Sequence, residues 1–169
     1  MPKKTIIFDL DGTICDVTHR RKFVASKPKN WDAWNKGIAL DTPNEAVKFM
    51  FESIVHKIGV EVIFVSGRGE EYRKETETWL IDNGFDPFLF YTLPRNRRSY
   101  EGRDFASNLY MRRAGDKRDD SIVKGEIADK IVAEGRDIFC VFDDRKRVVD
   151  MWIDRGIFVF DVGQGMGDF

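Results

Sequence analysis

Cysteines and long apolar runs are scarce in this sequence. Among 169 residues there are two cysteines, Cys15 and Cys140. Their spacing fits no metal site, and two are too few for a disulfide framework, which favours a reducing compartment. No run approaches the roughly 18 apolar residues of a membrane span, and the first residues lack the cleavage site of a signal peptide. We therefore expect a cytoplasmic protein that does not enter a membrane.

Net charge is also nearly absent. The 28 lysines and arginines almost balance 29 aspartates and glutamates, for a formal charge of -1. This balance excludes a uniformly basic coat for nucleic acid but leaves room for local patches. The length and the 42% hydrophobic content fit one globular domain with its own core, and we expect residues 1–169 to form it.

Short apolar runs alternate with helical patterns along the chain. The runs cover residues 5–8, 60–65, 138–142 and 157–160, with a weaker one at 88–91. Helices are expected over residues 70–83, 120–134 and 145–155, and Thr42-Pro43-Asn44-Glu45 resembles a capping box that starts another, ending before Gly59. Wholly apolar strands separated by helices predict an α/β fold with a mostly parallel sheet covered on both faces.

Two segments fall outside this alternation and are expected to be insertions over the site. Residues 16–41 are basic and contain Trp31 and Trp34, which either stack on a base or anchor the insertion to the core. Residues 92–119 are rich in arginine. The stretch from Arg95 to Arg118 has eight basic and three acidic residues, with aromatic residues among them. Such a stretch contacts nucleic acid or forms a solvated face.

Polar residues gather where the expected strands end. The first strand is followed by Asp9-Leu10-Asp11-Gly12-Thr13, the second by Ser66-Gly67-Arg68 and a later one by Asp143-Asp144, while Lys124 lies on the helix before that strand. Each motif alone is common as a turn, a loop or a helix cap. In a parallel sheet, however, these ends face one crevice. Four carboxylates in one crevice repel each other, and a divalent cation such as Mg²⁺ would relieve that repulsion.

Together these motifs resemble a known family. FDLDGT, VSGR, Lys124 and FDD match, in order, the four motifs of the haloacid dehalogenase-like (HAD) phosphatases. More narrowly, AGDKRDDSIVKGEI and FDDRKRVVDMW, with the later RGIFVF and GDF, resemble the phosphatase half of the bacteriophage polynucleotide kinase/3′-phosphatases. The resemblance spans nearly the whole chain except residues 92–108. It implies a three-layer Rossmann-like fold with a five-stranded sheet and small cap insertions.

The resemblance also implies roles for the residues in these motifs. Asp9 would attack phosphorus and form an aspartyl-phosphate, while Asp11 would protonate the leaving oxygen and later activate water. Ser66 would bind phosphoryl oxygens, and Lys124 would neutralise charge on Asp9 and on the transferring group. The implied Mg²⁺ ligands are the Asp9 carboxylate, the Asp11 main-chain carbonyl, Asp143 and Asp144.

Further residues are implied to bind substrate. Arg68 matches a functional arginine directly, and Asp120, four residues before Lys124, matches an aspartate. Arg20 lies where a second arginine is expected, with Arg21 as a close alternative. For Arg20 and Asp120, a surface ion pair or a helix N-cap is the competing explanation. The substrate-binding residues predicted from the sequence are Arg20, Arg68, Thr13, Gly67 and Asp120.

The predicted function is removal of the 3′-phosphate from DNA or RNA ends by a Mg²⁺-dependent phosphatase. The sequence contains no Gly-x-x-x-x-Gly-Lys-Ser/Thr motif, so we expect no kinase domain, and a kinase or ligase step would belong to a separate protein. One alternative is a HAD phosphatase of mononucleotides or other small phosphate esters. Another is a binding module without turnover, although the presence of both Asp9 and Asp11 argues against it.

Overall fold

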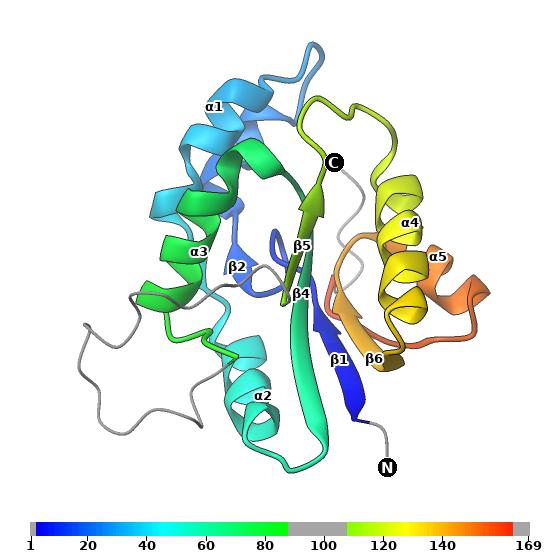
Figure 1. Ribbon diagram of the computed structural model, residues 1–169. Helices are drawn as coiled ribbons and strands as arrows, with labels where there is room; N and C mark the ends of the chain where they lie inside the picture. Colours follow the sequence, from blue (N-terminus) through cyan, green and yellow to red (C-terminus); the bar gives the residue numbers. More distant parts are fainter. Residues whose placement is uncertain (1–2, 88–107, 164–169) are drawn as a thin grey trace.

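A five-stranded parallel sheet forms the centre of the computed structural model, which describes residues 3–87 and 108–163 (Figure 1). In the order of the sheet, its strands are β5 (Leu109–Arg112), β4 (Val60–Gly69), β1 (Lys4–Phe8), β6 (Asp137–Asp143) and β7 (Phe158–Asp161). Every neighbouring pair runs parallel. The middle strand β1 carries Ile6, Ile7 and Phe8, all buried, as expected for a strand covered on both faces.

The register places the ends of β1 and β6 level with the middle of β4. Phe8 at the end of β1 lies opposite Phe64 of β4 and Phe142 of β6. Asp9 therefore leaves the sheet between the segments that carry Ser66 and Asp143. Parallel strands thus bring together polar residues that are more than fifty positions apart in the sequence.

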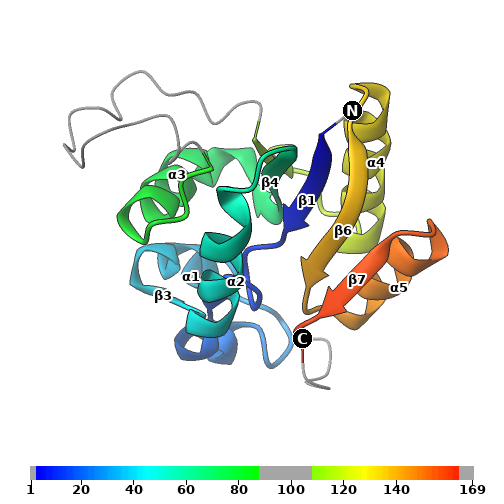
Figure 2. The same cartoon turned by 90° about the horizontal axis from the view of Figure 1, so that it is seen from below.

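Helices cover the sheet on both faces, as Figures 1 and 2 show. On one face lie α2 (Glu45–Val55) and α3 (Arg73–Asp82), the latter preceded by the short helix η3 (Glu70–Tyr72). On the other lie α4 (Asp120–Ala133) and α5 (Lys146–Asp154). Each face has its own apolar core, centred on Phe51 in the first and on Trp152 in the second. Across the two described ranges, no helix has both the length and the apolar character to cross a bilayer.

A small cap precedes α2 in the chain. It is bounded by a two-stranded antiparallel ribbon, β2 (Cys15–Asp16) with β3 (Thr42–Pro43). Between these strands the chain forms η1 (Thr18–Phe23), α1 (Trp31–Lys36) and η2 (Ile38–Leu40). This cap corresponds to the segment expected at residues 16–41.

The predicted fold class is confirmed, but the segment 92–119, which was expected to be an insertion, contains a strand of the sheet. This strand is β5, which forms the edge beside β4. Polar Asn108 and Arg112 flank its three buried residues, and so short a run gives little apolar signal in the sequence. The weak strand candidate at residues 88–91 lies outside the described residues.

The predicted capping box is also wrong. Thr42 and Pro43 pair with β2, and α2 begins at Glu45 after Asn44, whose side chain accepts no capping hydrogen bond. The tertiary pairing of the ribbon fixes an extended backbone where the local pattern favoured a helical turn. The other helices begin and end within a few residues of their predicted bounds, α3 following the short helix η3.

Phe51→Ala should destabilise the domain strongly. The Phe51 ring is fully buried and packs against Phe8, Phe64 and Phe85, at centroid distances of 5.8, 5.9 and 5.2 Å. Its removal leaves a cavity that costs about 3–5 kcal/mol of unfolding free energy. Phe49→Ala on the same helix is the matched control, because Phe49 is 67% exposed and its loss should cost under about 0.5 kcal/mol. Urea unfolding of the two variants measures the difference, and equal losses would contradict the assignment of the core.

Candidate active site

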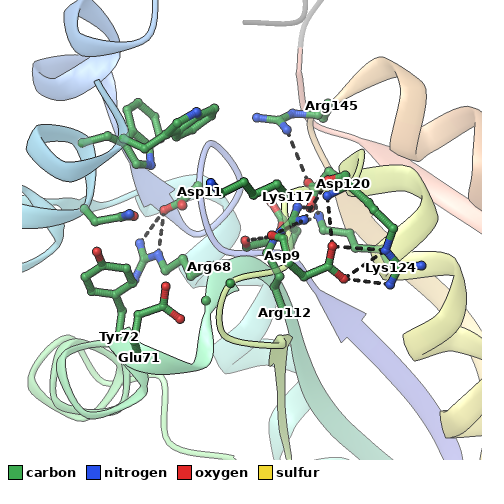
Figure 3. A pocket seen from close by; sticks show the side chains of 18 of the residues that line it. Asp9, Asp11, Arg68, Glu71, Tyr72, Arg112, Lys117, Asp120, Lys124 and Arg145 are labelled. Atoms are coloured by element: carbon green, nitrogen blue, oxygen red, sulfur yellow. Dashed lines mark hydrogen bonds and ion pairs between the residues drawn. The ribbon is translucent and has the colours of Figure 1, made fainter. Parts of the chain in front are cut away.

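The candidate active site lies at the carboxyl ends of β1, β4 and β6, with Asp9 at its centre (Figure 3). The Asp9 N–H donates to the Phe142 carbonyl at 2.9 Å, which continues the pairing of β1 with β6 by one residue. The chain then turns through Gly12, whose φ of +89° lies in the left-handed region that glycine adopts without strain. A Cβ at Gly12 would lie 2.1 Å from an Asp144 carboxylate oxygen, so the turn packs directly on that residue.

Lys124 is the buried cation of this centre. Its Nζ donates to Asp9 Oδ1 at 2.6 Å and to Asp143 Oδ2 at 2.9 Å. Burial by itself lowers the pKa of this lysine, but the charges of Asp143 and Asp9 outweigh burial and raise it well above its ordinary value. Lys124 therefore stays charged and offsets one of the carboxylates around it.

One lysine does not balance the carboxylates at this point. Asp9, Asp143 and Asp144 each offer an oxygen, and these oxygens lie within 4.8 Å of one another. Burial first, and then the neighbouring carboxylates, raise the pKa of Asp9 well above its usual range. Burial and Asp143 likewise raise the pKa of Asp144 to about 6. These raised pKa values indicate that nearby positive charge does not fully balance the negative charge of the cluster.

The donor set fits a divalent cation. Three carboxylates and one lysine carry a net charge of about -2 when ionised, which a doubly charged ion cancels. Carboxylate oxygens are hard ligands of the kind that bind Mg²⁺. Thr13 supports two of these carboxylates, because its hydroxyl lies 3.2 Å from Asp9 Oδ2 and 3.3 Å from Asp144 Oδ1.

Asp11 belongs to a second charged group, on the cap side of Asp9. Its Oδ1 accepts from Arg20 Nη2 at 2.6 Å, from Arg68 Nε at 3.0 Å and also from Arg68 Nη2. Burial raises the pKa of Asp11, but the guanidinium groups of Arg68 and Arg20 outweigh it and hold the pKa well below its usual range. Of the two neighbouring arginines considered from the sequence, it is Arg20 that bonds to Asp11.

Asp41 is a partner in this group that the sequence did not reveal. Its side chain is fully buried, and it accepts from Arg20 Nε at 2.7 Å and from Arg68 Nη2 at 3.0 Å. Trp79 Nε1 donates to the Asp41 carbonyl at 2.8 Å. Two arginines thus face two carboxylates, and the group is neutral overall. Asp41 stands in no motif of its own, so only its position in the folded cap brings it to the site.

Asp11, Cys15 and Asp41 also lie close enough together to suggest a metal site, but arginine already occupies this place. Arg68 Nη2 lies 3.4 Å from Cys15 Sγ and also bonds to both carboxylates. The positive charge that a cation would bring is therefore already present. Burial raises the pKa of the Cys15 thiol well above its ordinary value, so that it stays protonated.

Ser66, Gly67 and Asp120 form a further edge of the site. Ser66 is buried, and its hydroxyl accepts from the Arg68 N–H at 3.1 Å. A Cβ at Gly67 would lie 2.3 Å from Asp120 Oδ1, which explains glycine at this position. Asp120 accepts from Arg112 Nη2 at 3.0 Å and from Arg145 Nη1 at 3.4 Å. It therefore holds two basic side chains beside the pocket, and it also lines the pocket itself.

A pocket of about 460 Å³ opens above these residues. This volume lies in the range of small-molecule sites and exceeds what a phosphate group alone would fill. Figure 3 shows Tyr72 on the Asp11 side of Asp9 and Arg145 and Lys124 on the opposite side. The cap contributes Trp31, Trp34 and Asn35 to the lining.

In the described part of the arginine-rich segment, two arginines are held by contacts within the chain. Arg112 donates to the Gly67 carbonyl at 2.8 Å as well as to Asp120, and Arg118 forms ion pairs with Asp116 and Glu126. Lys117 is exposed and lines the pocket. The remaining basic residues between 95 and 103 lie outside the described part of the chain.

Solved structures resemble this chain over most of its length. Two chains from structures of the Pnkp1/Rnl/Hen1 complex, one described as an RNA repair complex, are 28% identical with a TM-score of 0.69. Each match covers 95% of this chain but only 42% and 45% of the other chain, so this chain spans less than half of those relatives. A class C acid phosphatase from Bacillus anthracis is 17% identical with a TM-score of 0.54, covering 99% of this chain and 70% of the other. At that identity the likeness shows the fold alone.

The sequence also matches a family directly. Residues 3–169 match the family described as the polynucleotide kinase PNKP phosphatase domain. The match spans the motifs around Asp9, Ser66, Lys124 and Asp143, which the structure brings to one pocket. This chain therefore belongs to the PNKP phosphatase-domain family and is a phosphatase of the HAD type.

Proposed function

We propose that this domain removes the 3′-phosphate from the ends of DNA or RNA in a Mg²⁺-dependent reaction. The observation that carries the proposal is the pocket of about 460 Å³ with Asp9 on its floor and arginines beside it, in a chain of the PNKP phosphatase-domain family. A terminal nucleotide, and not only its phosphate, matches a pocket of this size. The domain, residues 1–169 with the cap at 16–41, would act as one catalytic unit.

Asp9 is the proposed nucleophile. Lys124 and Thr13 hold its two oxygens, which fixes the direction of the carboxylate. An Asp9 oxygen attacks phosphorus, and the bond from phosphorus to the 3′-oxygen breaks, leaving an aspartyl-phosphate. Water then attacks this phosphorus, the bond to Asp9 breaks, and inorganic phosphate leaves. Lys124 and the Ser66 hydroxyl would offset charge on the transferring phosphoryl group.

Asp11 is the proposed acid and base. Its Oδ1 is held by Arg20 and Arg68, which also bond to Asp41. A phosphate entering the pocket offers these guanidinium groups another anion, and arginines that turn to it free Asp11 to face the leaving oxygen. Once the guanidinium groups turn to the phosphate, they no longer hold the pKa of Asp11 low, and Asp11 takes up a proton from solvent. Asp11 gives this proton to the 3′-oxygen in the first step and takes one from water in the second.

Mg²⁺ is the proposed cofactor, with ligands from the Asp9 carboxylate, the Asp11 main-chain carbonyl, Asp143 and Asp144. The excess of negative charge around Asp9 supports this set. When bound, the ion offsets charge on the phosphate and lets it approach a carboxylate. Gly12 and Thr13 pack against Asp144 and keep it turned toward Asp9.

The proposed reaction would be one step in the repair of nucleic-acid ends. Removal of a 3′-phosphate leaves the 3′-hydroxyl that ligation requires, so a kinase and a ligase are the proposed partners. The similarity to chains of the Pnkp1/Rnl/Hen1 complex supports this view. We propose a cytoplasmic location, in keeping with two cysteines that are both unpaired and buried.

Asp9→Asn should abolish phosphate release. An amide is a poor nucleophile, and its neutral oxygen pairs weakly with Lys124, so we expect a loss of about 10⁴-fold or more. The assay measures phosphate released from one oligonucleotide carrying either a 3′- or a 5′-phosphate, with Mg²⁺ and with EDTA. The wild-type protein should act on the 3′ end, only with Mg²⁺.

The matched control for Asp9→Asn is Asp129→Asn. Asp129 is an exposed residue of α4 that pairs with Arg155 and should leave the rate unchanged. Release from the 5′ end alone would contradict the specificity. Release from p-nitrophenyl phosphate but from neither oligonucleotide would favour the alternative, a phosphatase of small phosphate esters.

Asp11→Asn should slow the first chemical step more for a leaving group that must be protonated than for one that need not be. A 3′-hydroxyl is a poor leaving group, and loss of its acid should cost about 10²–10⁴-fold. The leaving group p-nitrophenol needs no proton, so its release in the first turnover should change little. Single-turnover release of each alcohol measures this step apart from the later attack of water. Equal losses on both substrates would contradict the acid role.

A further inference from the structure

Trp31 is a large aromatic side chain that the mechanism above does not use. It is the first residue of α1, it is 46% exposed, and it lines the pocket that holds Asp9. Trp34, one turn later, is only 3% exposed and belongs to the apolar core. Both tryptophans line the pocket, but the buried Trp34 anchors the cap, whereas Trp31 keeps an exposed surface that can meet a ligand.

Trp31 is held in place by a chain of contacts that ends at Asp11. Its ring meets the Trp34 ring nearly at right angles, with centroids 6.3 Å apart. The Trp34 ring lies 4.2 Å from Arg20 Cζ, and Arg20 donates to Asp11. The Asn30 side chain caps α1 by accepting from the Ala33 N–H at 3.0 Å. Trp31 is thus a supported platform within a few contacts of the reacting groups.

We propose that Trp31 stacks on the base of the 3′-terminal nucleotide while its phosphate lies against Asp9. This inference rests on the proposed nucleic-acid substrate and identifies the part of it that the cap recognises. Lys29 Nζ lies 5.4 Å from the Trp31 ring centre, and this exposed cation–π contact is weaker than stacking of a base, which displaces it.

The charges around the pocket support this orientation. Tyr72 and the carboxylate of Glu71 lie near each other on the Asp11 side, as Figure 3 shows. An acidic group favours a neutral base over a phosphate on that side. Lys117 and Arg145 line the same pocket, and these basic side chains suit the phosphate of the preceding nucleotide.

Stacking also sets a condition on the substrate. A base inside a strand is stacked on both faces, whereas a terminal base has a free face that Trp31 can cover. The cap should therefore recognise the terminal base of the strand. Because stacking recognises the face of a base, this selection would not depend on which base is present.

The test compares two single-stranded 3′-phosphorylated oligonucleotides that differ only at the terminal nucleotide, which has a base or is abasic. In the wild-type protein, kcat/KM should be about tenfold higher with the base, the value typical of one stacked base. Trp31→Ala should bring this ratio close to one, mainly through KM, and Trp31→Phe should keep most of it. Phe158→Ala is the control, because Phe158 is an exposed ring of β7 away from the pocket and should leave the ratio unchanged.

Two results would overturn the stacking proposal. One is a wild-type ratio near one, and the other is a ratio that Trp31→Ala leaves unchanged. Both leave the proposed 3′-phosphatase activity standing, since the oligonucleotides are still consumed. If the wild-type protein consumes p-nitrophenyl phosphate but neither oligonucleotide, the proposed function fails first, and the stacking proposal fails with it.

Discussion

Burial of several carboxylates at one edge of a sheet is the constraint that organises this protein. Asp9, Asp143 and Asp144 lie close together with one lysine between them, and burial and mutual repulsion raise the pKa of both Asp9 and Asp144. Without a bound cation, burial of such a cluster lowers the free energy of unfolding of the domain. The same excess of negative charge makes the centre suited to a cation, so the cost in stability and the proposed phosphate chemistry would have one origin.

In the second charged group, the carboxylates are balanced by arginines. Asp11 and Asp41 are balanced within the chain by Arg20 and Arg68, with no need for a metal. The two groups meet at the turn from Asp9 to Asp11, so that one segment takes part in both. The group around Asp9 would bind a cation, and the group around Asp11 contains guanidinium groups that can bind phosphate. A phosphate ester placed between the two groups would therefore meet positive charge on both sides.

The cap connects this electrostatic arrangement with recognition. Asp41 and Arg20 both come from the cap, and Trp34 packs on Arg20. The contacts that hold the cap in place therefore also place the Arg20 guanidinium beside Asp11. Trp31 meets the Trp34 ring edge to face and, like Trp34, lines the pocket. Binding of a nucleotide and orientation of the reacting groups would depend on one small structural unit.

The parallel α/β fold and the motifs that gather at the strand ends could be predicted from the sequence alone. Largely apolar runs such as residues 5–8 and 138–142 specify strands of a parallel sheet, and the residues that follow them must then meet at one edge. The role of Asp41, the different exposure of Trp31 and Trp34, and the extended pairing of Thr42 and Pro43 are known only from the folded structure. The same is true of the position of β5 beside β4. These features depend on contacts between distant segments, which no local pattern of residues encodes.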